Sequence, residues 1–202
     1  MARKALDVPT FIKSYWNYYL ELENHFRETE RFVDFDNQNN STFSIEYIKL
    51  LQAICSEIDV VGKEIASACN PAFVVDRNTD IPKWGYEVQK AFPEIDTMKV
   101  QFWGEYELQP WKNWKYELKT GKKKPTLQAK CSSPEWWNAY NSVKHRRTDK
   151  YKGNRYNYTR ANLRNVSTAL AALYILEILF VEKISKKDER NDYDSSRLFR
   201  II

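Results

Sequence analysis

The sequence predicts a mainly α-helical protein, an antiparallel bundle of four to five helices with one short extended insertion. Apolar residues recur every three or four positions through several long segments, which is typical of amphipathic helices. The pattern alternates only within a stretch near residues 97–131, which indicates extended chain. With 202 residues, 43% of them hydrophobic and 15% aromatic, the chain fits a single ordered domain spanning 1–202.

The first two helices are predicted at about 11–29 and 44–69. Thr10, which follows a proline, is a plausible N-cap for the first helix, whose buried face is unusually aromatic. Ser44 can cap the second helix, and Pro71 ends it. Its apolar stripe is long enough to cross the whole bundle.

Three more helices are predicted at about 81–92, 133–146 and 159–185. Asp80 followed by a proline in the first turn indicates a helix start, and Ser132 or Ser133 can cap the next helix in the same way. The last helix is apolar on nearly every side between residues 169 and 181. A thirteen-residue run that contains a glutamate is too short for a bilayer span and indicates a buried helix.

The insertion at 97–131 should be extended, as one or two short strands, with an exposed basic loop at 119–124. Met98, Val100 and Phe102 alternate with polar residues before a glycine breaks the pattern. A basic loop follows and includes Lys122, Lys123 and Lys124. The tail from residue 198 to residue 202 is apolar except for Arg200, so we expect it to dock on the body of the protein or to reach a partner chain.

Composition favours a cytoplasmic protein without a metal or other cofactor. The first residues have no apolar run behind them, so no secretory signal is predicted. Three cysteines are an odd number, which favours a reducing compartment, and neither cysteine nor histidine clusters at the short spacings of metal ligands. No membrane association is expected.

Positive charge is concentrated in one part of the chain. Residues 1–111 contain 11 basic and 18 acidic residues, a net charge of −7. Residues 112–164 contain 15 basic and 3 acidic residues, a net charge of +12. This asymmetry predicts an anionic partner for the basic segment, either a nucleic acid or the acidic half of the protein itself.

The basic segment contains a stretch in which apolar anchors lead directly into polar residues. Trp136 and Trp137 are followed by Tyr140, Asn141, Lys144, His145, Arg146 and Arg147. Helical spacing allows much of this polar set to share one face. A histidine can accept and return a proton near neutral pH, and adjacent cations can stabilise phosphoryl charge. We therefore regard these residues as a candidate catalytic site.

The stretch resembles the HEPN superfamily of small helical-bundle domains, many of which are metal-independent ribonucleases. Its members carry an arginine, usually a polar residue, and then a histidine before a loop and a long final helix. Asn141 matches the polar position and His145 matches the histidine. The resemblance covers about residues 44–69 and 132–185, and it implies a helical-bundle fold and a homodimer whose two motifs face each other.

The resemblance further implies an endoribonuclease of a toxin or phage-defence system, with His145 as acid or base on the ribose 2′-hydroxyl. One position departs from the family pattern, because Tyr140 stands where the family has its arginine. The charge that stabilises the phosphorane would then come from Lys144, Arg146 or Arg147, or from a second subunit.

Three alternatives remain open from the sequence. The first is an inactive HEPN-like module that binds RNA, a nucleotide or a protein partner such as an antitoxin or a defence-complex subunit. Its basic contacts would be Lys122, Lys123, Lys124, Lys150, Lys152 and Arg155. In the second, the basic segment instead binds the acidic half of the protein or another subunit. In the third, Asn141 and His145 only hydrogen-bond across the helix end, with the tryptophans as ordinary core.

Overall fold

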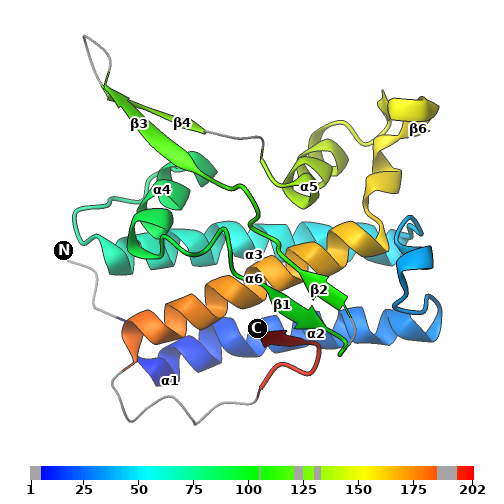
Figure 1. Ribbon diagram of the computed structural model, residues 1–202, viewed down its shortest axis with the longest axis horizontal. Helices are drawn as coiled ribbons and strands as arrows, with labels where there is room; N and C mark the ends of the chain where they lie inside the picture. Colours follow the sequence, from blue (N-terminus) through cyan, green and yellow to red (C-terminus); the bar gives the residue numbers. More distant parts are fainter. Residues whose placement is uncertain (1–5, 105, 121–124, 130–132, 186–194) are drawn as a thin grey trace.

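The computed structural model describes residues 6–104, 106–120, 125–129, 133–185 and 195–202. The chain is mostly helical, at 60%, and carries a small antiparallel sheet. Two long helices, α3 (Ile45–Cys69) and α6 (Leu163–Ile184), pack against each other through the middle of the molecule (Figure 1). The expected predominance of helix is therefore confirmed.

The N-terminal helix begins earlier than predicted. It runs through α1 (Val8–Phe11), a π-helical turn (Ile12–Trp16) and α2 (Asn17–Glu28). The cap is Asp7 rather than Thr10, because the Asp7 carboxylate accepts a hydrogen bond from the Thr10 backbone N–H at 2.9 Å. Proline falls in the first turn, where its missing N–H is not needed.

The predicted starts of α3 and of α4 (Ile81–Ala91) are confirmed. Ser44 accepts a hydrogen bond from the Tyr47 backbone N–H at 3.1 Å, and Asp80 caps α4. The two helices approach closely at Gly62, where a Cβ atom would lie 2.6 Å from the ring of Trp84. Any larger residue at this position would force the two helices apart.

Helix α6 starts later than predicted, at Leu163 with Asn162 as its N-cap, and a 3-10 turn (Asn157–Arg160) precedes it. The helix is long and apolar enough to cross a membrane, but 83% of its most apolar window is buried inside the fold. This agrees with the expectation of a buried helix. Glu177, near its C-terminal end, is fully buried.

The predicted extended insertion forms four short strands. They are β1 (Val100–Phe102), β2 (Tyr106–Leu108), β3 (Tyr116–Thr120) and β4 (Pro125–Ala129). Strands β3 and β4 form an antiparallel hairpin that projects from the body at one corner (Figure 1). Strands β1 and β2 pair with Val100 opposite Leu108. The lysines 122–124 lie outside the described residues.

The C-terminal tail docks on the body as a third strand. Strand β7 (Phe199–Ile201) pairs antiparallel with β1, which gives the sheet order β2-β1-β7. The segment before β7 is held by Glu23 of α2, which is only 2% exposed. Its carboxylate accepts hydrogen bonds from the hydroxyls of Tyr19 and Ser196 and from the backbone N–H groups of Arg197 and Leu198, at 2.6–3.1 Å.

Candidate functional site

Helix α5 (Glu135–His145) is fixed to the core through its first residues. Trp136 is 2% exposed, and its indole N–H donates to the backbone carbonyl of Pro110 at 2.9 Å. Its ring meets Trp111 edge-to-face at 5.2 Å between centroids. Ala139 and Val143 are buried on the same side of the helix as Trp136. These apolar contacts orient the helix and leave its polar side outward.

The start of α5 differs from the prediction. The helix begins at Glu135, with Pro134 in the cap position and no side-chain cap. Ser133 contributes its backbone carbonyl, which accepts from the Asn138 side-chain amide at 2.9 Å. A glutamate in the first turn interacts favourably with the positive end of the helix dipole, so the start does not depend on a serine cap.

The chain folds back on itself after the last turn of α5. Strands β5 (Lys150–Tyr151) and β6 (Arg155–Tyr156) form a small antiparallel hairpin. Asn157 ties this hairpin to the helix end, because its side-chain amide donates to the Arg146 backbone carbonyl at 2.8 Å. The Tyr158 backbone N–H donates to the Arg147 carbonyl at 3.1 Å. The basic residues of the hairpin are thereby held beside the end of α5.

Arg160 makes a second connection between the two segments. Its guanidinium donates to the Ser142 hydroxyl at 2.6 Å and forms an ion pair with Glu135 at 2.7 Å. Its side chain is only 15% exposed. Arg160 therefore positions the segment rather than offering charge to a ligand.

The last turn of α5 and the hairpin form an exposed basic surface, which we call the α5-terminal surface. All of its side chains are solvent-exposed, and its members are Lys144, His145, Arg146, Arg147, Lys150, Arg155 and Tyr156. Cationic side chains with an exposed aromatic ring suit a chain of phosphates and unstacked bases.

In this surface and next to it, the polar side chains that the sequence singled out carry few internal contacts. Asn141, Lys144 and His145 follow at the i, i+3 and i+4 positions of one helix face. Among the described residues, no hydrogen bond or ion pair involves the side chain of Asn141 or that of His145. The alternative in which these two side chains only hydrogen-bond across the helix end finds no such bond among the described residues, where Asn157 and Arg160 connect this junction.

Tyr140 is separated from solvent, unlike the basic residues from Lys144 to Arg147. It is 7% exposed and packs on Trp137, with 5.0 Å between ring centroids. Its hydroxyl accepts a hydrogen bond from the Lys144 ammonium at 3.1 Å, and that cation lies 5.2 Å from the centre of the tyrosine ring. A lysine charge therefore lies next to the buried Tyr140 side chain.

The remaining cations differ in how strongly the fold engages them. The Arg147 guanidinium donates to the Val143 backbone carbonyl at 3.3 Å, which satisfies part of the helix end. Lys150 lies 5.4 Å from the centre of the Tyr156 ring. Lys152 belongs to the 3-10 turn between β5 and β6.

Sequence reasoning missed an aromatic pair in this region. Tyr156 and Tyr158 stack with 5.6 Å between centroids and 14° between planes, and Tyr156 is 41% exposed. Phe43 meets Tyr158 edge-to-face at 5.7 Å and supports the pair from the loop before α3. Tyr158 lies in the 3-10 turn that follows β6, so the spacing of the two tyrosines alone does not predict that they stack.

No family model, curated protein or solved structure matches this chain. Within the part of the chain that the structure describes, no group of three or more histidine, cysteine, aspartate or glutamate residues could hold a metal ion. The chemistry available at the α5-terminal surface is that of an imidazole, an amide and several cations.

Proposed function

We propose that this protein is a HEPN-like helical-bundle ribonuclease that acts on RNA at the α5-terminal surface. The observation that carries the proposal is the position of His145. Its side chain is exposed at the end of α5, on the same helix face as Asn141 and Lys144, and the described residues give it no internal partner. A polar side chain that the fold does not use remains available to a substrate.

In the proposed reaction, His145 takes the proton of a ribose 2′-hydroxyl. The 2′-oxygen then attacks the adjacent phosphorus, and the bond from phosphorus to the 5′-oxygen of the next nucleotide breaks. That oxygen leaves with a proton taken from water, and the protonated His145 returns its proton to the solvent. The products therefore carry a 2′,3′-cyclic phosphate and a free 5′-hydroxyl. Lys144 and Arg146 supply positive charge to the phosphorane, and Asn141 binds a phosphate oxygen.

Substrate binding is assigned to the cations and the aromatic ring of the hairpin. Lys150 and Arg155 contact phosphates, and Tyr156 stacks on an unpaired base. Single-stranded RNA fits this arrangement, because its bases are free to stack and its backbone follows a row of cations. The expected localisation is cytoplasmic, and the expected assembly is a homodimer, alone or with a protein partner such as an antitoxin or a defence-complex subunit.

A second candidate function is RNA binding without cleavage. Tyr140 favours it, because this side chain is buried and cannot act as the family's arginine does. In that case the same surface binds RNA and His145 contributes only a contact.

The test is incubation of the purified protein with mixed RNA in the presence of EDTA, followed by analysis of the product ends. We expect cleavage with 2′,3′-cyclic phosphate ends by the wild type and none by His145→Ala. His25→Ala is the matched control, since His25 is exposed on α2 and pairs with Glu21 at 2.9 Å. Cleavage retained in His145→Ala would refute the assignment of this histidine.

Salt dependence of RNA retention separates the second candidate from the first. We expect the Lys150→Gln and Arg155→Gln double variant to bind RNA more weakly, with a salt slope smaller by about 1.4, or roughly 0.7 for each lost phosphate contact. Arg200→Gln, at an exposed position on β7, is the charge-matched control for one substitution. Retention without cleavage supports the binding module, and salt-insensitive or absent retention contradicts both candidates.

A further inference from the structure

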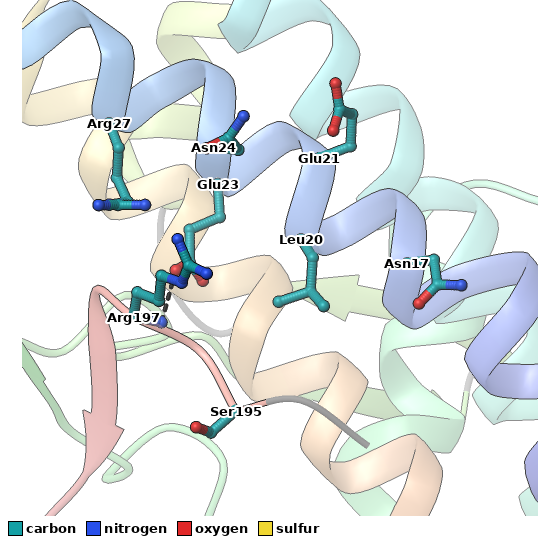
Figure 2. A pocket seen from close by; sticks show the side chains of 8 residues that line it. All are labelled: Asn17, Leu20, Glu21, Glu23, Asn24, Arg27, Ser195 and Arg197. Atoms are coloured by element: carbon teal, nitrogen blue, oxygen red, sulfur yellow. Dashed lines mark hydrogen bonds between the residues drawn. The ribbon is translucent and has the colours of Figure 1, made fainter.

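A polar cavity of about 410 Å³ lies between α2 and the segment before β7, away from the α5-terminal surface. Figure 2 shows the side chains around it, which come from one face of α2 and from Ser195 and Arg197. The polar residues used below are Asn17, Glu23, Asn24, Arg27, Ser195 and Arg197. The volume falls within the range of small-molecule sites.

Two arginines of this cavity lack a partner for their charge. Among the described residues, neither the Arg27 nor the Arg197 guanidinium forms an ion pair or a hydrogen bond. The Nε atom of Arg27 is buried and has no acceptor among the described residues. A buried N–H without an acceptor is unfavourable, so these residues leave the hydrogen-bonding capacity of this guanidinium unsatisfied.

The nearby carboxylates do not fill that role. Glu23 already accepts four hydrogen bonds, from Tyr19, Ser196 and the backbone of residues 197 and 198. Glu21 pairs with His25 at 2.9 Å, and its side chain points away from the two guanidiniums (Figure 2). Among the described residues, both guanidiniums therefore line the cavity without a carboxylate partner, because the two glutamates of the lining are engaged elsewhere.

This arrangement selects a particular ligand chemistry. A guanidinium group binds phosphate oxygens through paired N–H donors. Two guanidinium groups can therefore hold one phosphate from two sides. The amides of Asn17 and Asn24 and the hydroxyl of Ser195 also line the cavity and can bind sugar hydroxyls. We propose that this cavity binds a phosphate group between Arg27 and Arg197, carried by inorganic phosphate or by a small phosphorylated sugar.

The experiment is isothermal titration of three probes: inorganic phosphate, ribose 5-phosphate and ribose. The protein carries Arg146→Gln and Arg147→Gln in every arm, so that phosphate cannot bind to those two arginines. Arg27→Gln and Arg197→Gln are each expected to weaken phosphate binding at least tenfold. Arg200→Gln, an exposed arginine outside the cavity, is expected to leave the affinity unchanged.

The probes distinguish the two sources of phosphate. Tighter binding of ribose 5-phosphate than of inorganic phosphate assigns the site to a phosphorylated sugar, and equal affinities assign it to phosphate itself. Arg197 is exposed, so its substitution tests the site even where Arg27→Gln disturbs folding. Absence of binding by both phosphate probes, or unchanged affinity in Arg197→Gln, overturns the proposal. These binding measurements do not depend on RNA cleavage, so the phosphate site can fail while the proposed ribonuclease function stands, and the reverse.

Discussion

Two polar regions of this protein are built in opposite ways. Glu23 is buried, and both of its carboxylate oxygens accept hydrogen bonds from the segment before β7. At the end of α5, His145 and its neighbours are exposed, and the fold uses only some of them. The first region holds the chain together. The second is attached through Asn157 and Arg160, which leaves its remaining polar groups free for a ligand.

The largest effect on stability is expected where Glu23 is removed. Glu23→Ala leaves the N–H groups of residues 197 and 198 without their side-chain acceptor, and the buried Tyr19 hydroxyl keeps only the Ser196 hydroxyl as a partner. We expect the free energy of unfolding to fall by about 3 kcal/mol, because each unsatisfied buried donor costs about 1–3 kcal/mol. Denaturant unfolding measures the change.

The control for this prediction is Glu21→Ala on the same helix. Glu21 has a side chain that is 58% exposed and pairs only with His25 at the surface. Its loss should change stability by less than about 0.5 kcal/mol. Equal effects of the two substitutions would mean that Glu23 does not anchor the C-terminal segment.

A different buried carboxyl should respond to pH. Burial, and then the negative charge of Glu57, hold the pKa of Glu177 well above its ordinary value near 4.5, and neither oxygen has a hydrogen-bond partner among the described residues. The folded state thus binds this proton more tightly than the unfolded state. Its contribution to stability is full below about pH 4.5 and is lost as pH rises through the folded pKa.

The Glu177→Gln variant keeps the shape of the side chain and removes the ionisation. We expect it to be more stable than the wild type by about 1–2 kcal/mol at pH 8 and to lose the advantage near pH 4. Unfolding at several pH values measures this, with exposed Glu182→Gln as the control. A difference between variant and wild type that does not change with pH would contradict the assignment.

A smaller effect is expected at the connection between α5 and the hairpin. Asn157→Ala removes the hydrogen bond to the Arg146 carbonyl from a residue that is 6% exposed. We expect a loss of about 1 kcal/mol and faster amide hydrogen exchange at residues 149–158. Thr148→Ala, at an exposed position, is the control, and equal exchange in the two variants would refute the anchoring role.

The sequence was informative wherever structure depends on neighbouring residues. The caps Ser44 and Asp80 and the apolar face of α3 are local signals, and the structure confirms them. The pairing of β1 with β7 joins segments almost a hundred residues apart, so no local pattern could predict it. Glu23, whose carboxylate holds this tail, cannot be distinguished from an exposed glutamate by the sequence alone.

The candidate site was likewise predictable only where it depends on residues close together in the sequence. Spacing placed Asn141, Lys144 and His145 on one helix face, because helical geometry fixes that relation. Spacing could not show that Tyr140 is buried or that Asn157 and Arg160 hold the junction. These depend on how α5 packs against the tryptophans and on how the chain returns after it.

The central claim is that His145 serves a substrate and not the fold, and one variant tests it directly. Unfolding and RNA cleavage are measured on the same preparation of His145→Ala. We predict a stability change below about 0.5 kcal/mol, as for surface positions, together with complete loss of cleavage. Unchanged cleavage, or a loss of activity that follows a large loss of stability, would contradict it.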